Sequence, residues 1–173
     1  GVYISPSSRG WHDKIGYIPQ TIYMLDDTIR NNIAFGKKEG INDEDVWAAL
    51  RQAQLDEFVE SLEEGLDTVI GEAGVRLSGG QRQALTLLMA TLKKPKVLLL
   101  DEHTAALDPK TAAKVLDTTE AIVNENHLTT LMITHNMRDA IQIGNRLIMM
   151  MEGKIILDIQ GEEKKKLKVA DLL

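Results

Sequence analysis

The chain has 173 residues, no cysteine and a formal net charge of −6 at pH 7. Its length suits one domain with an inserted lobe, its acidity argues against a protein that neutralises nucleic-acid phosphates, and the lack of cysteine excludes disulfides and thiolate metal sites. Its longest apolar run is far shorter than the roughly 20 residues that span a bilayer, so we expect a water-soluble chain.

The first part of the sequence predicts one strand followed by short helices. Ile15-Gly16-Tyr17-Ile18 reads as a strand that Pro19 ends. Asp27 opens a short helix, and Asn42 caps a second helix whose first turn is acidic, where negative charge suits the helix dipole. Apolar residues continue at helical spacing, so we expect residues 22–76 to form a small helical lobe.

From Ser78 onward the pattern changes to helices alternating with strands. Ser78 with Gln81 fits a capping box, so a helix should begin at Gly79 and run to about Leu92. The next elements expected are a strand over Val97–Leu100 and a helix that Asp108 caps, with Pro109 at its first position. A buried strand over 129–134 and a helix that Asn136 caps should follow, and then a hairpin of 146–151 with 154–158. This order indicates a mostly parallel sheet with helices on its faces.

Two adjacent carboxylates, Asp101 and Glu102, come directly after the aliphatic strand. In an open α/β sheet, ligands bind beyond the carboxyl ends of the strands. Asp101 is placed to hold Mg²⁺, directly or through water, and Glu102 to act as general base on an attacking water. The alternative is that both residues only end the strand and cap the next segment, and the glycine-rich segment at Ser78 weighs against it.

The segment Ser78-Gly79-Gly80-Gln81 combines a hydroxyl with backbone N–H groups at the start of a helix. The positive end of the helix dipole favours an anion, and glycines let the backbone approach it closely. An ordinary capping box explains Ser78 and Gln81 but not two consecutive glycines. We therefore expect this segment to bind a phosphate.

The four histidines differ in their sequence surroundings. A lone histidine is most often a satisfied core or surface residue, and we interpret His12, His103 and His127 in this way. His135 ends a strand that we expect to run parallel to Val97–Leu100, which would place it near Glu102 at one edge of the sheet. There it could hydrogen-bond a γ-phosphate or hold the attacking water.

Two further kinds of site are not expected. No pair of histidines has metal-ligand spacing together with a thiol, which argues against a protein-built zinc site. The basic run Lys164–Lys168 comes after two acidic residues, and we interpret it as the solvated face of a helix rather than a membrane-binding patch.

Taken together, these segments resemble the motifs of ATP-binding cassette (ABC) ATPases. Leu77-Ser78-Gly79-Gly80-Gln81 resembles the signature motif of that family. The other matches, in the family's order, are Gln20 for the Q-loop glutamine, Val97 to Glu102 for the Walker B strand with its catalytic glutamate, Ala105-Ala106-Leu107-Asp108 for the D-loop and His135 for the switch histidine. The five motifs cover residues 14 to 158.

The resemblance implies an α/β fold, an incomplete P-loop NTPase (RecA-like) parallel sheet with an inserted helical subdomain. It implies hydrolysis of ATP with Mg²⁺ in a head-to-tail dimer with a second ABC ATPase domain. Ser78 to Gln81 would then bind the partner's nucleotide. The residues implied for the chain's own nucleotide are Gln20, Glu102 and His135 as catalytic residues, and Asp101 with Gln20 for Mg²⁺ through ATP. Asp108 is implied as the aspartate of the D-loop.

The resemblance also implies a transmembrane transporter domain or subunit as partner, at the cytoplasmic side of a membrane, and no nucleic acid. The helical lobe with Gln20 would be the coupling surface. We expect three regions: 1–21 as a remnant of the nucleotide-binding core with the Q-loop, 22–92 as the helical subdomain ending in the signature helix, and 93–173 as the RecA-like core with the remaining motifs and the hairpin.

The sequence departs from the family in two respects. No G-x-x-x-x-G-K-[ST] phosphate loop occurs, and the nearest segments, at Gly36 and Gly153, lack the earlier glycine and the hydroxyl. We therefore expect negligible ATP affinity for this chain alone, and a truncated fragment of a longer chain. In addition, residues 14–83 resemble exporter or flippase cassettes, whereas 84–173 resemble stand-alone ABC ATPase subunits.

Three functions stay open on the sequence. The first is the ATP-binding subunit or domain of an ABC transporter, which couples ATP binding and hydrolysis to transport. The second is a non-catalytic ABC remnant that donates its signature face to a partner cassette. The third is an ABC ATPase of DNA repair or translation, which the acidic balance and the lack of a coiled-coil insertion argue against.

Overall fold

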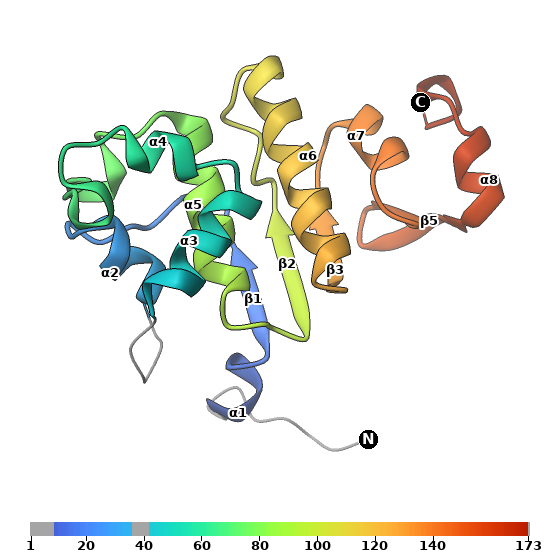
Figure 1. Ribbon diagram of the computed structural model, residues 1–173. Coiled ribbons are helices and arrows are strands. Elements are labelled where there is room, and N and C mark those ends of the chain that lie inside the picture. The colour runs from blue at the N-terminus through green and yellow to red at the C-terminus, as the bar shows by residue number, and fades with distance from the viewer. Residues whose placement is uncertain (1–8, 36–41, 173) are drawn as a thin grey trace. The chain divides into compact units, whose positions relative to one another are not determined.

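A computed structural model describes residues 9–35 and 42–172 (Figure 1). The chain divides into two compact units, residues 1–132 and 133–173, and each unit is described by itself. The segment at Gly36, one of the two that most nearly match the phosphate-loop sequence, lies outside the described residues.

A three-stranded parallel sheet forms the centre of the first unit, as the sequence predicts. Strands β1 (Ile15–Ile18), β2 (Val97–Asp101) and β3 (Thr129–Ile133) lie in the order β1-β2-β3. β1 and β2 pair in parallel, with Ile15 opposite Val97 and Ile18 opposite Leu100. The α/β fold class is therefore confirmed.

The expectation that β3 is a buried strand is wrong. Leu131 and Ile133 are 55% and 53% exposed, whereas Met132 between them packs against the core. Side chains alternate between the two faces of a strand, so only one face of β3 is covered. A continuous apolar run in the sequence does not reveal this, because it looks the same whether one face is covered or both.

Two long helices accompany the sheet. α5 (Gly79–Thr91) packs against β1, and α6 (Pro109–Glu125) packs against α5. Ser78 caps α5 with both hydrogen bonds of a capping box, and Asp108 caps α6 with Pro109 at its first position, as the sequence predicts. The middle of α5 is buried through Leu85, Leu87 and Leu88, and it forms the core of this unit together with β1 and β2.

Short helices build the lobe between β1 and α5. They are α2 (Ile29–Ala34), α3 (Asp43–Gln52), α4 (Asp56–Glu60) and the 3-10 turns η1 (Gly65–Asp67) and η2 (Glu72–Gly74), and a further short helix, α1 (Arg9–His12), precedes β1. Asn42 caps α3 as predicted, but the cap of α2 is Thr28, one residue after the expected Asp27. Arg30 pairs with Asp43 and Asp67 and so links three of these elements.

The second unit consists of a hairpin between two short helices, followed by a 3-10 turn. Its elements are α7 (Met137–Gln142), β4 (Arg146–Met151), β5 (Lys154–Gln160), α8 (Gly161–Lys166) and η3 (Val169–Leu172). β4 and β5 pair antiparallel as predicted, with a bulge between Met149 and Met150. Among the described residues of the chain, no helix combines the length and apolar character that crossing a bilayer requires.

The interpretation of Lys164–Lys168 as a solvated helix face is wrong for Lys164. This side chain is only 3% exposed. Its Nζ donates hydrogen bonds to the carbonyl oxygens of Ile141 and, at 2.9 Å, Ile143. The last carbonyls of a helix have no partner within it, and Lys164 satisfies those at the end of α7.

A buried asparagine organises the loop that leads into α2. Asn32 is fully buried, and its Oδ1 accepts from the backbone N–H of Leu25 at 2.9 Å. Its Nδ2 donates to the carbonyl oxygens of Leu25 at 3.1 Å and Thr28 at 3.0 Å. The side chain therefore replaces backbone partners that an irregular loop lacks.

A second buried polar residue, His103, lies in the turn after β2. It is 2% exposed, and its Nε2 lies 3.3 Å from the hydroxyl of Thr119 on α6. Burial lowers the pKa of His103 from its ordinary 6.5 to about 4, because a charged imidazolium loses its hydration there. The interpretation of His103 as a satisfied core histidine is confirmed.

We expect Asn32→Ala to lower the free energy of unfolding by about 2–3 kcal/mol, because it leaves several buried backbone groups without partners. Urea denaturation measures the change. Asn124→Ala on the exposed surface of α6 is the matched control and should cost almost nothing. A cost for Asn32→Ala equal to that of the control would contradict the role given to Asn32.

The pKa of His103 predicts an acid sensitivity. The unfolded chain takes up a proton near pH 6.5 and the folded chain only near pH 4, so stability is full above pH 6.5 and falls as the pH drops toward 4. Between pH 7 and pH 5, the wild type should lose about 2 kcal/mol more unfolding free energy than His103→Leu. Equal losses in the two proteins, measured by urea denaturation at both values, would be the contrary result.

Candidate functional site

The adjacent ends of β1 and β2 bring four polar side chains together at one edge of the sheet. The hydroxyl of Tyr17 donates to Asp101 Oδ2 at 3.2 Å. Nε2 of Gln20 donates to Glu102 Oε2, also at 3.2 Å. Because parallel strands end on the same side of a sheet, residues 82 and 84 positions apart in sequence meet here.

Glu102 has an unusual backbone conformation. Its φ is +46°, in the left-handed region that residues with a Cβ rarely occupy. Such a conformation costs roughly 1–2 kcal/mol and persists only where the surroundings hold it. The turn after it is held by hydrogen bonds from Ala105 N to Glu102 O at 3.0 Å and from Leu107 N to Thr104 O at 3.1 Å. Gln54, Ala73, Lys94, His127 and Glu152 also have a positive φ, so the hydrogen bond to Gln20, and not the backbone conformation alone, marks Glu102 as a site residue.

The turn ends at Asp108, whose side chain is fully engaged with α6. Its Oδ1 accepts from the backbone N–H groups of Lys110 and Thr111, each at 3.1 Å. These hydrogen bonds, led by one from the Thr111 side chain, lower the pKa of the Asp108 carboxyl. Asp108 therefore fixes where α6 begins, in addition to any role in the D-loop that its sequence position predicts.

The second candidate segment is the turn from Ser78 to Gln81, which we call the signature turn. Gln81 N donates to Ser78 Oγ at 3.2 Å, and Ser78 N donates to Gln81 Oε1 at 2.8 Å. Residues in the first turn of a helix have N–H groups without partners inside the helix, and Gly79 and Gly80 hold such positions. The Ser78 hydroxyl accepts one hydrogen bond and keeps a proton to donate, so the turn can bind an anion.

The two glycines of the signature turn also have a packing reason, which the sequence does not reveal. A Cβ added to Gly79 would lie 2.9 Å from Leu107 Cδ2, and one added to Gly80 would lie 2.7 Å from Thr111 Cγ2. The start of α5 therefore lies directly against Leu107 and the first turn of α6. A side chain at either glycine would therefore displace Leu107 or Thr111, whether or not a phosphate binds.

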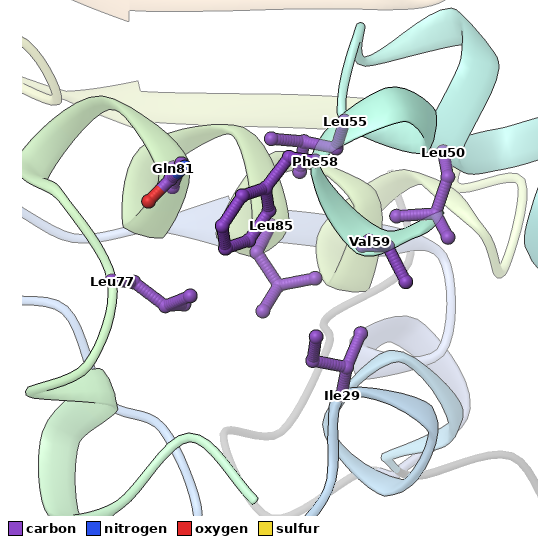
Figure 2. Close-up of a pocket in the computed structure, with 8 residues that line it drawn as sticks. All are labelled: Ile29, Leu50, Leu55, Phe58, Val59, Leu77, Gln81 and Leu85. Carbon is purple, nitrogen blue, oxygen red and sulfur yellow. The ribbon is translucent and has the colours of Figure 1, made fainter. Parts of the chain in front are cut away.

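An apolar pocket lies behind the signature turn (Figure 2). It is bounded by α2, the segment from α3 to α4, and the start of α5, through Ile29, Leu50, Leu55, Phe58, Val59, Leu77, Gln81 and Leu85. Gln81 is its one polar lining residue, and the amide oxygen of Gln81 already accepts from Ser78 N. Without converging polar groups, the pocket does not resemble a site for a charged nucleotide.

His135 lies between β3 and α7, in the second unit. Asn136 after it caps α7, accepting from Arg138 N at 3.0 Å and Asp139 N at 3.4 Å. Since His135 and Glu102 belong to different units, their proximity stays a prediction.

The carboxylates at the strand ends fit Mg²⁺ that arrives with a nucleotide. Within residues 9–35 and 42–172, no group of three or more His, Cys, Asp or Glu side chains is arranged to hold a metal by itself. Mg²⁺ is usually held by only one or two carboxylates, with phosphate oxygens and waters as its other ligands. Asp101 at the tip of β2 supplies a carboxylate of this kind.

Sequence reasoning missed Tyr17 as a member of the site. The sequence pattern places Tyr17 only within the first strand, although it comes one residue before the end of β1 and Asp101 is the last residue of β2. The available signal was the pairing of the two strands. Adjacent parallel strands place the residues at their ends within reach of each other.

Comparisons with known proteins identify the family of this chain. The family model for ABC transporters matches residues 3–105, more than half of the chain. The tyrosine transport ATP-binding protein of Clostridioides difficile (strain R20291) is 57% identical over 97 residues, which is 56% of this chain and 39% of that protein. The ATP-dependent lipid A-core flippase of Syntrophus aciditrophicus (strain SB) is 37% identical over 143 residues, covering 83% of this chain and 23% of the flippase.

Comparison with solved structures identifies the same family. A bacterial Atm1-family ABC exporter with ATP bound superposes with a TM-score of 0.72 at 33% sequence identity, over 84% of this chain and 25% of the exporter chain. The chain thus spans 23% to 39% of the length of these similar proteins. The chain belongs to the ABC transporter family and corresponds to its ATP-binding domain.

Proposed function

We propose that this chain provides the ATP-hydrolysing edge of an ABC transporter and couples ATP binding and hydrolysis to transport across a membrane. The observation that carries the proposal is the hydrogen bond between Gln20 and Glu102 at the shared end of β1 and β2. It joins the two residues that the family resemblance assigns to the Q-loop and to the catalytic base, although they lie far apart in sequence.

Each residue of this edge has a distinct role in the proposal. Glu102 accepts a proton from the attacking water, and Gln20 holds the carboxylate of Glu102 by its amide N–H. Asp101, oriented by the Tyr17 hydroxyl, holds Mg²⁺ with Gln20 when ATP is bound. When bound, the ion neutralises charge on the phosphate oxygens. His135 binds the terminal phosphate or the water.

The signature turn serves a second nucleotide in this proposal. Its Ser78 hydroxyl and the N–H groups of Gly79 and Gly80 bind the phosphates of ATP held by a second ABC ATPase domain in a head-to-tail dimer. The capping box supports this role, because it fixes the Ser78 side chain at the start of α5. Gln81 contributes by holding that box closed.

Coupling depends on the helical subdomain in residues 22–92, between the core segments 1–21 and 93–173. We place the contact with a transmembrane partner on this subdomain and on Gln20, at the cytoplasmic side of the membrane. Two similar proteins from Lactococcus lactis are described as both ATP-binding and permease protein, which supports a membrane-spanning partner.

A second candidate is a non-catalytic cassette that donates only its signature turn. The sequence favours this second candidate in one respect, because the chain contains no G-x-x-x-x-G-K-[ST] phosphate loop. An assay of phosphate release distinguishes a catalytic cassette from a non-catalytic donor. A catalytic cassette in its full-length form releases phosphate from Mg-ATP without help, whereas a donor does so only when mixed with a complete ABC ATPase domain.

We expect Glu102→Gln in the full-length protein to lower ATP turnover by about 10²-fold or more while ATP binding persists, because the amide cannot accept the proton. Turnover is measured by phosphate release and binding by equilibrium dialysis. Glu120→Gln on the exposed surface of α6 is the control and should leave both unchanged. Unchanged turnover in Glu102→Gln would remove it from the role of base.

We expect Ser78→Ala to weaken the ATP-dependent dimer, and to leave ATP binding to the chain's own half-site intact, because the serine acts on the partner's nucleotide. Analytical ultracentrifugation with and without ATP measures the dimer. Ser61→Ala, in the helical lobe, is the matched control. A loss of binding at the chain's own half-site would contradict the assignment to the partner's nucleotide.

A further inference from the structure

His103, the residue after Glu102, is the most deeply buried residue of the turn. His103 is 2% exposed, whereas Asp101 and Glu102 before it are half-buried and Ala105 and Ala106 after it are exposed. Its ring nitrogen Nε2 lies 3.3 Å from Thr119 Oγ1, in the middle of α6. A histidine thus ties the turn at the strand end to a long helix.

The hydrogen bonds around Thr119 define which nitrogen of His103 carries the proton. The Thr119 hydroxyl donates to the carbonyl oxygen of Val115 at 2.8 Å, so its single proton is already used. Thr119 Oγ1 must then accept from His103. The neutral imidazole therefore carries its proton on Nε2.

The turn between Glu102 and Asp108 is consequently held on α6 at two points. The bond between His103 and Thr119 holds its start, and the cap that Asp108 forms with Lys110 and Thr111 holds its end. Glu102 immediately precedes the first point and has the left-handed φ of +46°. An unfavourable conformation at a functional site is maintained by the structure around it. The pairing of β2 fixes one side, and His103 fixes the other.

We propose that His103 is a positioning residue, which holds the backbone of Glu102 in its left-handed conformation and so directs the Glu102 carboxylate toward Gln20 and the reacting water. This inference rests on the proposed function in one respect, since it takes Glu102 as the base. His103 acts through the backbone of Glu102, which immediately precedes it.

Three variants separate positioning from filling of space. His103→Leu fills the site but has no donor. His103→Gln keeps an N–H at a similar reach from the backbone. Thr119→Val keeps the shape of Thr119 and removes the acceptor. His127→Asn, at an exposed turn, is the matched control.

The first experiment uses this chain without nucleotide. Amide hydrogen exchange is measured at Ala105 and Leu107, whose N–H groups close the turn. His103→Leu and Thr119→Val should each speed exchange there by about tenfold, while the amides of α5 keep their rates. His103→Gln should restore most of the protection, and the double variant His103→Leu/Thr119→Val should exchange no faster than either single variant. Unchanged exchange at Ala105 and Leu107, or equal acceleration throughout the unit, would overturn the proposal.

The second experiment measures turnover in the full-length protein. His103→Leu should lower kcat about tenfold with KM for ATP unchanged, and His103→Gln should recover it, because only the direction of the base is affected. In a Glu102→Gln background, His103→Leu should have no further effect. A kcat of wild-type size, or a KM that rises as kcat falls, would overturn the role of His103. If Glu102→Gln itself keeps full turnover, the proposed function fails, whatever His103 does.

Discussion

The parallel alignment of β1 with β2 is the constraint on which the candidate site depends. It places the end of one strand beside the end of the other, with Ile18 opposite Leu100. The residues just beyond each strand, Gln20 and Glu102, can then form a hydrogen bond although they are 82 positions apart in sequence. A shift of the pairing by one position would move one strand end about 3.3 Å along the other, which is enough to separate two groups that now lie 3.2 Å apart.

Much of the architecture depends on local signals that can be recognised in the sequence. The helix starts at Ser78, Asn42, Asp108 and Asn136 all have the capping side chains that the sequence predicts for them. A cap depends on residues within one turn of each other, so it can be recognised without knowing the fold. The signal that predicts the hairpin is also local, because its two strands are joined by a short turn. The one displaced helix start, at Thr28 instead of Asp27, concerns neighbouring residues that can both act as caps.

The features that the sequence did not reveal depend on packing between distant segments. The burial of Lys164 depends on where α7 ends. The exposure of one face of β3 depends on which residues cover the strand. The Tyr17 to Asp101 contact needs the strand order. Gln20 and Glu102 are assigned to the same nucleotide only through the resemblance to ABC ATPases, and residue chemistry alone would leave Gln20 as a solvated turn residue. The hydrogen bond between them is a finding of the structure. For His135, which lies in the other unit, the expectation stays a prediction.

The tight contact of Gly79 and Gly80 with Leu107 and Thr111 has a consequence for how substitutions at these glycines are interpreted. Any replacement at either glycine introduces a methyl group or more into space that the D-loop and α6 already fill. A substitution of either glycine in the signature turn therefore also disturbs the packing of the neighbouring loop. A loss of activity in such a variant would therefore not by itself show that these glycines bind a nucleotide.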